Sequence, residues 1–291
     1  MDFPPAHEAF FGFVERPFSL TPDPKYYFRS RSHSRAFDAL SDGVAHRESV
    51  LLVTGDLGVG KTTLCRTFIG LLQHKTRVAL VGNALVSPED LLRVLLQDLG
   101  GVSKEEVRSG RLAGATRVEL NEMLDAFLGA SRNGAVLIVD EAQSLPAATV
   151  EQIIALAARD GNRERSLQIV LAGQPAVNGG AAVPKVIDQL LTTRARLLPL
   201  ERDECDRYIS HRLAIAGGEG VVFDARAIDV IYTLSGGVAR LVNLLCEHGL
   251  QQGAAAKARR IESGMIESAA AAFQLGRLRP KRFRWFGAQA R

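Results

Sequence analysis

This chain of 291 residues has few of the residues that mark disulfide-rich or zinc-binding proteins. Its three cysteines, Cys65, Cys205 and Cys246, lie far apart, and its six histidines show no metal-ligand spacing. Isolated cysteines are typical of a reducing compartment, where they usually pack as small core residues. The sequence therefore predicts neither a disulfide framework nor a structural zinc site.

The chain also has little of the apolar patterning that directs proteins into membranes. Residues 1–10 contain Asp2, Glu8 and two prolines, a composition that does not fit a secretory signal peptide. No apolar run reaches the length needed to span a bilayer. We therefore expect a cytoplasmic location.

Acidic residues are missing from residues 274–291, which hold six of the basic residues. The whole chain has a formal net charge of +4, so the rest of the chain is slightly acidic and does not indicate a globally basic surface for nucleic acid. The basic residues alternate with Leu278, Phe283, Trp285 and Phe286, as in segments that bind an anionic membrane surface. The alternatives are a solubilising tail and a nucleic-acid contact.

One glycine-rich stretch organises the chain. Residues 55–62 read Gly-Asp-Leu-Gly-Val-Gly-Lys-Thr and match the phosphate-binding loop G-x-x-x-x-G-K-[ST]. An apolar run precedes the loop at 49–54, and apolar residues follow at helical spacing over 63–72. Strand, loop and helix in this order point backbone N–H groups and the helix N-terminus at phosphates. The residues predicted to bind ATP are Gly55, Asp56, Leu57, Gly58, Val59, Gly60, Lys61, Thr62 and Thr63.

A second motif supplies the carboxylates that nucleotide hydrolysis needs. The apolar run 135–139 ends in Asp140 and Glu141. Because open α/β sheets bind ligands at the carboxyl ends of their strands, we expect both acids near the phosphate-binding loop. Thr62 and Asp140 are predicted to hold Mg²⁺, and Glu141 to orient and polarise the attacking water. The alternative is a strand end with two solvated acids.

Further apolar runs at 77–83 and 167–175, which end in the polar residue Asn83 and in Gln174-Pro175, predict two more parallel strands. Arg194 and Arg196 are interpreted as two arginines that lead into a last strand ending near Leu200. After Leu200 only helical patterns follow, which indicates a lid of four helices. Helix starts are predicted at Ser34, Ser87 and Thr116.

The predicted fold is an α/β P-loop domain followed by a small all-α lid domain. The predicted divisions are an N-terminal arm at 1–33, the P-loop ATPase domain at 34–200, the helical lid at 201–273 and a basic aromatic tail at 274–291. The arm is rich in proline and aromatic residues, and we expect an irregular segment that packs on the P-loop domain.

Together with the two motifs, three stretches resemble the ExeA/GspA-type ATPases of the AAA+ superfamily. The stretches are residues 11–28 with Pro-Asp-Pro at 22–24, residues 171–175, and residues 234–246 with Ser-Gly-Gly at 235–237. The resemblance covers about residues 8–272. It implies a five-stranded parallel sheet of order 5-1-4-3-2, and an ATP site at a subunit junction of a homo-oligomer.

The same resemblance implies roles for further polar residues. Asn83 matches the position that restrains the catalytic glutamate, and Gln174 matches sensor 1. Arg194 or Arg196 matches the arginine-finger region, and Arg240 matches sensor 2. A guanidinium near the γ-phosphate offsets the charge that spreads in the transition state.

Two departures from the family pattern concern the lid and the subunit contact. Ala239 stands where the family usually has a proline, and the loop at 176–184 is more glycine-rich than usual.

The function implied is a Mg-ATP-dependent ATPase that acts as an oligomeric switch. It would assemble or regulate a cell-envelope machine of the type II secretion or type IV pilus kind, with a partner protein of that machine. The location implied is cytoplasmic, or peripheral at the inner membrane through the tail. The rival is a DNA-binding ATPase of the transposition-regulator kind. A nucleotide-binding scaffold without turnover is a third reading, which the presence of Glu141 weakens.

Overall fold

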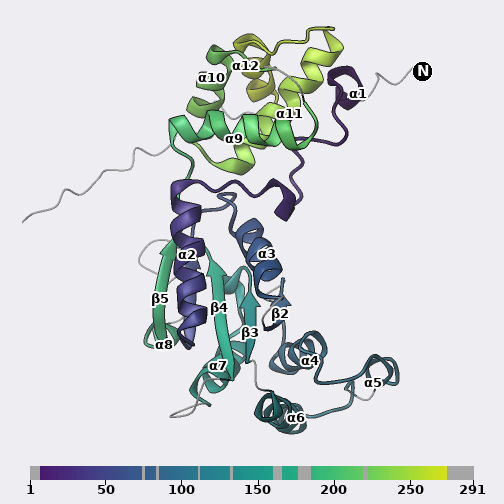
Figure 1. The fold of residues 1–291 in the computed structure, drawn as a ribbon, viewed down its shortest axis with the longest axis vertical. Helices are drawn as coiled ribbons and strands as arrows, with labels where there is room; N and C mark the ends of the chain where they lie inside the picture. The colour runs from purple at the N-terminus through teal and green to yellow at the C-terminus, as the bar shows by residue number, and fades with distance from the viewer. Residues whose placement is uncertain are drawn as a thin grey trace, which may run out of the picture. The chain divides into compact units, whose positions relative to one another are not determined.

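The computed structural model divides into two compact units (Figure 1). The sheet unit is Pro22–Leu198, and the lid unit combines Met1–Thr21 with Pro199–Arg291. The structure describes residues 7–73, 76–82, 85–110, 112–131, 134–159, 166–175, 185–218 and 222–273. The predicted tail at 274–291 and the loop at 176–184 lie outside these ranges.

Five parallel strands form the centre of the sheet unit. The strands are β1 (Val50–Thr54), β2 (Arg77–Val81), β3 (Ala135–Val139), β4 (Leu167–Gly173) and β5 (Leu191–Arg196). Their order is β2-β3-β4-β1-β5, which confirms the predicted sheet. The first strand of the sequence therefore lies between the last two, and the loop that follows it leaves the sheet near its middle.

Apolar side chains cover both faces of this sheet, because successive residues of a strand point to opposite faces. Leu52 and Leu171 belong to one buried cluster, whereas their neighbours Leu51 and Val170 belong to the other. The first cluster is completed by α4 (Pro88–Asp98), α6 (Arg117–Ala130) and α7 (Ala147–Ala158). The second is completed by α2 (Arg31–Ala45) and α3 (Lys61–Leu72). The shorter elements are η1 (Pro24–Tyr26), α5 (Lys104–Arg108), η2 (Ala142–Ser144) and α8 (Lys185–Asp188).

Side-chain caps begin three of these helices. The Ser87 hydroxyl accepts from the backbone N–H of the third residue of α4, and Thr116 forms a reciprocal capping box with Glu119. Both starts confirm the prediction. The predicted cap at Ser34 is wrong, because α2 begins one turn earlier with Ser30 as its cap. Ser34 therefore lies inside the helix.

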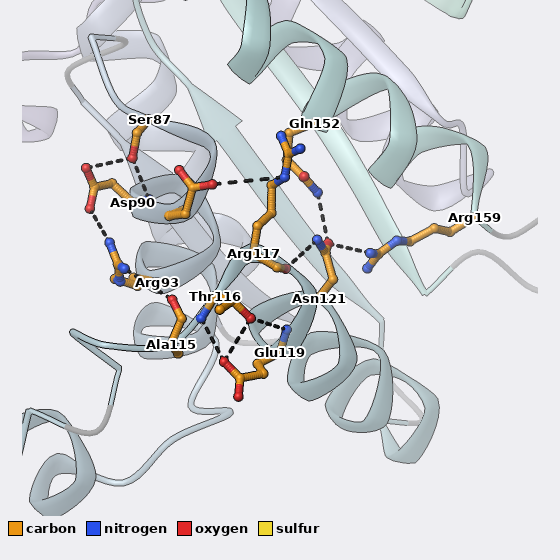
Figure 2. A network of polar contacts seen from close by, with 11 residues as sticks. Ser87, Asp90, Arg93, Ala115, Thr116, Arg117, Glu119, Asn121, Gln152 and Arg159 are labelled. Atoms are coloured by element: carbon orange, nitrogen blue, oxygen red, sulfur yellow. Dashed lines mark hydrogen bonds and ion pairs between the residues drawn. The ribbon is translucent and has the colours of Figure 1, made fainter.

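Polar contacts also tie α6 to α7 (Figure 2). Asn121 Oδ1 accepts from Gln152 Nε2 at 2.9 Å and from Arg159 Nη2 at 2.5 Å. Arg159 Nη1 also lies 2.6 Å from Asp125 Oδ1. These contacts join two helices that cover the same face of the sheet, so they serve packing.

The last strand differs from the prediction. Arg194 and Arg196 lie inside β5, opposite Leu52 and Thr54 of β1, and not before the strand. β5 is an edge strand in which exposed residues alternate with partly buried ones. Because one face of an edge strand meets water, polar side chains are tolerated there, and the strand has no continuous apolar run.

The lid unit contains the four predicted helices, with a short helix α1 (His7–Phe11) from the arm. They are α9 (Arg202–Ile215), α10 (Ala225–Ser235), α11 (Ala239–Ala255) and α12 (Ser263–Ala272). Gly236 and Gly237 join α10 to α11 with φ of +57° and +76°, in the left-handed region. A Cβ on Gly237 would lie 2.0 Å from the carbonyl oxygen of Leu200, and Leu200 N–H donates to the Gly237 carbonyl at 2.8 Å. This close backbone approach admits only glycine.

The arm divides between the two units, so its predicted packing on the P-loop domain is wrong for residues 7–21. The buried Arg212 of α9 donates to the carbonyl oxygens of Pro17, at 2.6 Å, and Ser19, at 3.3 Å. Phe18 is fully buried and meets Phe223 edge to face. A buried guanidinium needs acceptors, and an irregular segment has carbonyls that no helix or strand uses.

The second half of the arm does pack on the sheet unit, as predicted. Arg66 of α3 donates to the Pro22 carbonyl at 2.7 Å, and Tyr27 lies against Phe37 of α2. Within the residues described, no helix combines the length and apolar character that crossing a bilayer requires.

Candidate active site

The phosphate-binding loop lies between β1 and α3, as predicted. Gly58 and Gly60 have φ of +81° and +108°. A Cβ on Gly60 would lie 2.9 Å from Nε2 of the buried His33. The loop therefore needs glycine at residue 60 both for backbone conformation and for space.

Lys61 is the first residue of α3, and its side chain is only 4% exposed. Its Nζ donates to the carbonyl oxygens of Gly55, at 2.9 Å, and Asp56, at 3.1 Å. A buried ammonium needs such acceptors. These bonds hold the positive charge against the start of the loop, where the N-terminus of α3 adds its own partial charge.

The two predicted Mg²⁺ ligands lie in direct contact. The Thr62 hydroxyl donates to Asp140 Oδ2 at 2.5 Å, although 78 residues separate the pair. Asp140 follows the last residue of β3 and is 4% exposed. Hydroxyl and carboxylate oxygens suit Mg²⁺, which commonly takes one or two protein ligands beside nucleotide phosphates and water. The residues present therefore fit the ion.

A metal site built from protein ligands alone would need more ligands than the pair Thr62 and Asp140. The described ranges contain no group of three or more His, Cys, Asp or Glu side chains placed to hold a metal ion. Thr62 and Asp140 thus match a site that the nucleotide completes.

Glu141 has an uncommon backbone conformation, with φ +53° and ψ +39°. A side chain with a Cβ enters this left-handed region at a cost of about 1–2 kcal/mol. The Glu141 N–H donates to Asp140 Oδ1 at 2.9 Å. Strain of this kind often accompanies functional sites. Here it turns the chain out of the line of β3 directly after Asp140.

Gln143 makes two polar contacts at this site that the sequence did not predict. Its Nε2 donates to Glu141 Oε2 at 2.5 Å, and its Oε1 accepts from the backbone N–H of Gln174 at 3.0 Å. Gln174 follows β4 at the predicted sheet edge. The available signal was the position of Gln143, two residues after Glu141 at the end of a predicted strand.

The arginine candidates differ in their contacts. Arg194 Nη1 lies 2.7 Å from Asp188 Oδ1, and this hydrogen bond lowers the pKa of the Asp188 carboxyl. The Arg196 side chain makes no hydrogen bond or ion pair within the part of the chain that the structure describes. Arg240 is an exposed residue in the first turn of α11, in the lid unit. Asn83 lies outside the described residues.

The cysteines are buried free thiols, which confirms the predicted core role. Burial raises the pKa of the Cys65 thiol, next to the site in α3, and raises that of Cys205 to about 11. A thiol whose pKa is raised in this way stays protonated at neutral pH, as expected of a core residue.

Most residues of this site fall within a match to a known protein family. Residues 44–179 match a family model described as an AAA domain. The match contains the phosphate-binding loop, Asp140, Glu141 and Gln174. Residues 44–179 of this chain thus form an AAA domain. The chain is a P-loop protein of the nucleotide-binding class, with the sheet that the resemblance predicted.

Among curated proteins, this chain is similar to general secretion pathway protein A of Aeromonas hydrophila. The two are 34% identical over 266 residues, which are 91% of this chain and 48% of that protein. The chain thus spans about half the length of this relative. The predicted resemblance to the ExeA/GspA type is confirmed.

Several solved structures share the fold. Cdc6p from Pyrobaculum aerophilum has a TM-score of 0.69 at 15% identity, covering 89% of this chain and 71% of that one. The Aeropyrum pernix ORC2 protein in its ADPNP–ADP complexes has 0.66 at 14%, covering 89% and 72%. The RuvB branch migration motor of Thermotoga maritima has 0.56 at 19%, covering 88% and 72%.

Proposed function

We propose that this chain hydrolyses Mg-ATP at the end of β1 and β3. The observation that carries the proposal is the contact between Thr62 and Asp140, which joins the phosphate-binding loop to the strand end that bears Glu141. Thr62 and Asp140 would hold Mg²⁺, which neutralises phosphate charge when bound. Residues 55–63 would bind the phosphates, with Lys61 on the β- and γ-phosphates.

Glu141 is the proposed group that orients and polarises the attacking water. Its carboxylate accepts from Gln143, and its backbone N–H donates to the proposed metal ligand Asp140. A carboxylate in this place accepts a proton from water as the new P–O bond forms. Gln174 and Asn83 are proposed to assist at the same sheet edge.

Arg194 or Arg196 is proposed to act on the ATP of a neighbouring copy, and Arg240 to act as sensor 2. Arg194 and Arg196 lie on the exposed side of an edge strand, where a second copy can reach them. Between the two, Arg196 is the less constrained, since Arg194 is paired with Asp188. A homo-oligomer would then place a complete site at each junction.

The proposed role of hydrolysis is to switch the assembly of a cell-envelope machine, of the type II secretion or type IV pilus kind. Support comes from the similarity to a protein named for the general secretion pathway. The chain would act in the cytoplasm with an envelope-assembly protein as its partner. Residues 274–291 would hold it at the anionic inner-membrane surface.

The site is tested by Glu141→Gln. The amide keeps the size of the side chain but cannot accept the proton, so ATP should bind normally and hydrolysis should fall roughly 1,000-fold. Isothermal titration with ATP and a phosphate-release assay measure both. Full turnover by Glu141→Gln would remove Glu141 from the mechanism.

The oligomer is tested by mixing two inactive variants. Lys61→Ala keeps the arginines, and the double variant Arg194→Ala/Arg196→Ala keeps the phosphate-binding loop. Mixed junctions should restore part of the activity. Co-assembly without recovery would argue against action on a neighbour. Binding of DNA that weakens steeply with salt would favour the transposition-regulator rival.

A further inference from the structure

The end of β4 extends beyond the end of β3 in the sheet. Val139, the last residue of β3, lies opposite Leu171, so Gly173 and Gln174 continue past it. On the other side, the chain after β3 turns into the short helix η2 and carries Gln143 back toward β4. Glu141 and Gln174 come from different strands, and Gln143 joins them.

The partners determine how the Gln143 amide is oriented. A backbone N–H only donates, so the atom that faces Gln174 is Oε1. An ionised carboxylate only accepts, so the atom that faces Glu141 is Nε2. Each end of the amide thus meets the one type of group that it can bond. A side chain with only donors or only acceptors cannot make both contacts.

From this chain of bonds we propose that Gln143 is a positioning residue for Glu141. It holds the carboxylate at a fixed distance from the end of β4 and acts on the reaction only through Glu141. The inference rests on the proposed role of Glu141. The left-handed backbone of Glu141 fixes only the direction in which the side chain leaves the chain. The side-chain torsions can still turn, so a partner such as Gln143 is needed to fix the carboxylate.

Fixing the carboxylate favours catalysis more than binding. A displacement of about 1 Å in a reacting group lowers the rate roughly 100-fold. ATP contacts the phosphate-binding loop, whose bonds do not involve Gln143. Loss of the amide should therefore lower kcat and leave KM and the Kd for ATP unchanged.

The test compares the full-length variants Gln143→Met and Gln143→Glu with the unaltered parent protein. Methionine keeps the length of the side chain and removes both polar contacts. Glutamate keeps the acceptor for Gln174 but removes the donor and repels Glu141. Gln143 is exposed, so both variants should fold with an unchanged Tm. Gln97→Met, which alters an exposed glutamine of α4, is the matched control.

In single-turnover hydrolysis, Gln143→Met should lose roughly 10- to 100-fold in rate and Gln143→Glu at least as much, with ATP affinity within about twofold of the parent. Added to Glu141→Gln, Gln143→Met should cause no further loss, because the two residues act as a unit.

Three other outcomes would overturn this inference, and they distinguish its failure from that of the proposed function. Full turnover by Glu141→Gln would overturn both. An inactive Glu141→Gln together with fully active Gln143→Met and Gln143→Glu would overturn only the role of Gln143. A further loss when Gln143→Met is added to Glu141→Gln would also overturn it, because Gln143 would then act without Glu141.

Discussion

In the sheet unit the buried clusters on both faces are apolar and the proposed catalytic groups gather at one edge, whereas the lid unit encloses a polar network in its core. Asp140 and Glu141 directly follow the buried strand β3, and Lys61 begins the helix after the phosphate-binding loop. In the lid, Arg212 donates to the Tyr208 hydroxyl at 2.9 Å, which donates to Asn243 at 2.8 Å. The difference suggests a division of roles. Polar groups at the sheet edge should control activity, and those in the lid should control stability.

The largest effect on stability should come from Arg212→Met. The change leaves the carbonyls of Pro17 and Ser19 and the Tyr208 hydroxyl without their buried donor. Breaking such a buried charged network costs about 3–5 kcal/mol. Urea unfolding would measure this, with the exposed Arg207→Met as the matched control, expected within about 0.5 kcal/mol of the parent. Equal effects of the two changes would contradict a structural role for the network.

Lys61→Ala should have the opposite effect to Arg212→Met: it should weaken ATP binding and change the free energy of unfolding little. It removes the charge that the loop carbonyls hold for the phosphates, and ATP binding should weaken at least 100-fold, or about 2.8 kcal/mol. Isothermal titration provides the affinity, and Lys25→Ala, on an exposed lysine of η1, is the control. If Lys61→Ala unfolded the protein as readily as Arg212→Met, the division between the units would not hold.

Gly237→Ala should destabilise the lid unit by about 2–3 kcal/mol. The methyl group would overlap the Leu200 carbonyl, and alanine is strained at φ +76°. Gly264→Ala in α12 has free space around the new Cβ and should stabilise by about 0.5–1 kcal/mol. Thermal unfolding should move Tm in opposite directions for the pair. A shift in the same direction would mean that the backbone near Leu200 relaxes.

The smallest effect should come from the helix cap Ser87→Ala, about 1 kcal/mol of unfolding free energy. Ser268→Ala, inside α12, should be neutral or slightly stabilising, because that hydroxyl bonds the carbonyl four residues back. Urea unfolding of both variants would measure how much the Ser87 cap contributes to the free energy of unfolding. Equal values would mean that the Ser87 cap is not needed to start α4.

Sequence patterns correctly predicted the features that depend only on residues close together in the chain. The loop at 55–62, the buried strand before Asp140 and the capping box at Thr116 depend on neighbours within a few residues, so they were correct. The cap at Ser34 is a local error, since α2 begins one turn earlier at Ser30, but the errors in β5 and in the arm depend on distant partners. β5 is polar because its position at the sheet edge permits it, and no periodicity reveals that position.

Two further features of the molecule lie beyond sequence patterns for the same reason. Arg212 reads as an ordinary charged helix residue until Pro17, 195 residues earlier, is placed beside it. Gln143 needs the register of β3 with β4 before its contact with Gln174 can be seen. The predicted roles of Arg194, Arg196 and Arg240 stay proposals.

The division of the arm also has a consequence for synthesis on the ribosome. The sheet unit is contiguous in sequence, but residues 7–21 belong with helices that emerge last. At about 5–20 residues per second, the 195 residues between Pro17 and Arg212 take roughly 10–40 s to make. During that interval Phe13 and Phe18, buried in the finished protein, have no lid core to enter. The nascent chain therefore carries an exposed aromatic segment that a chaperone can hold until α9 has been translated.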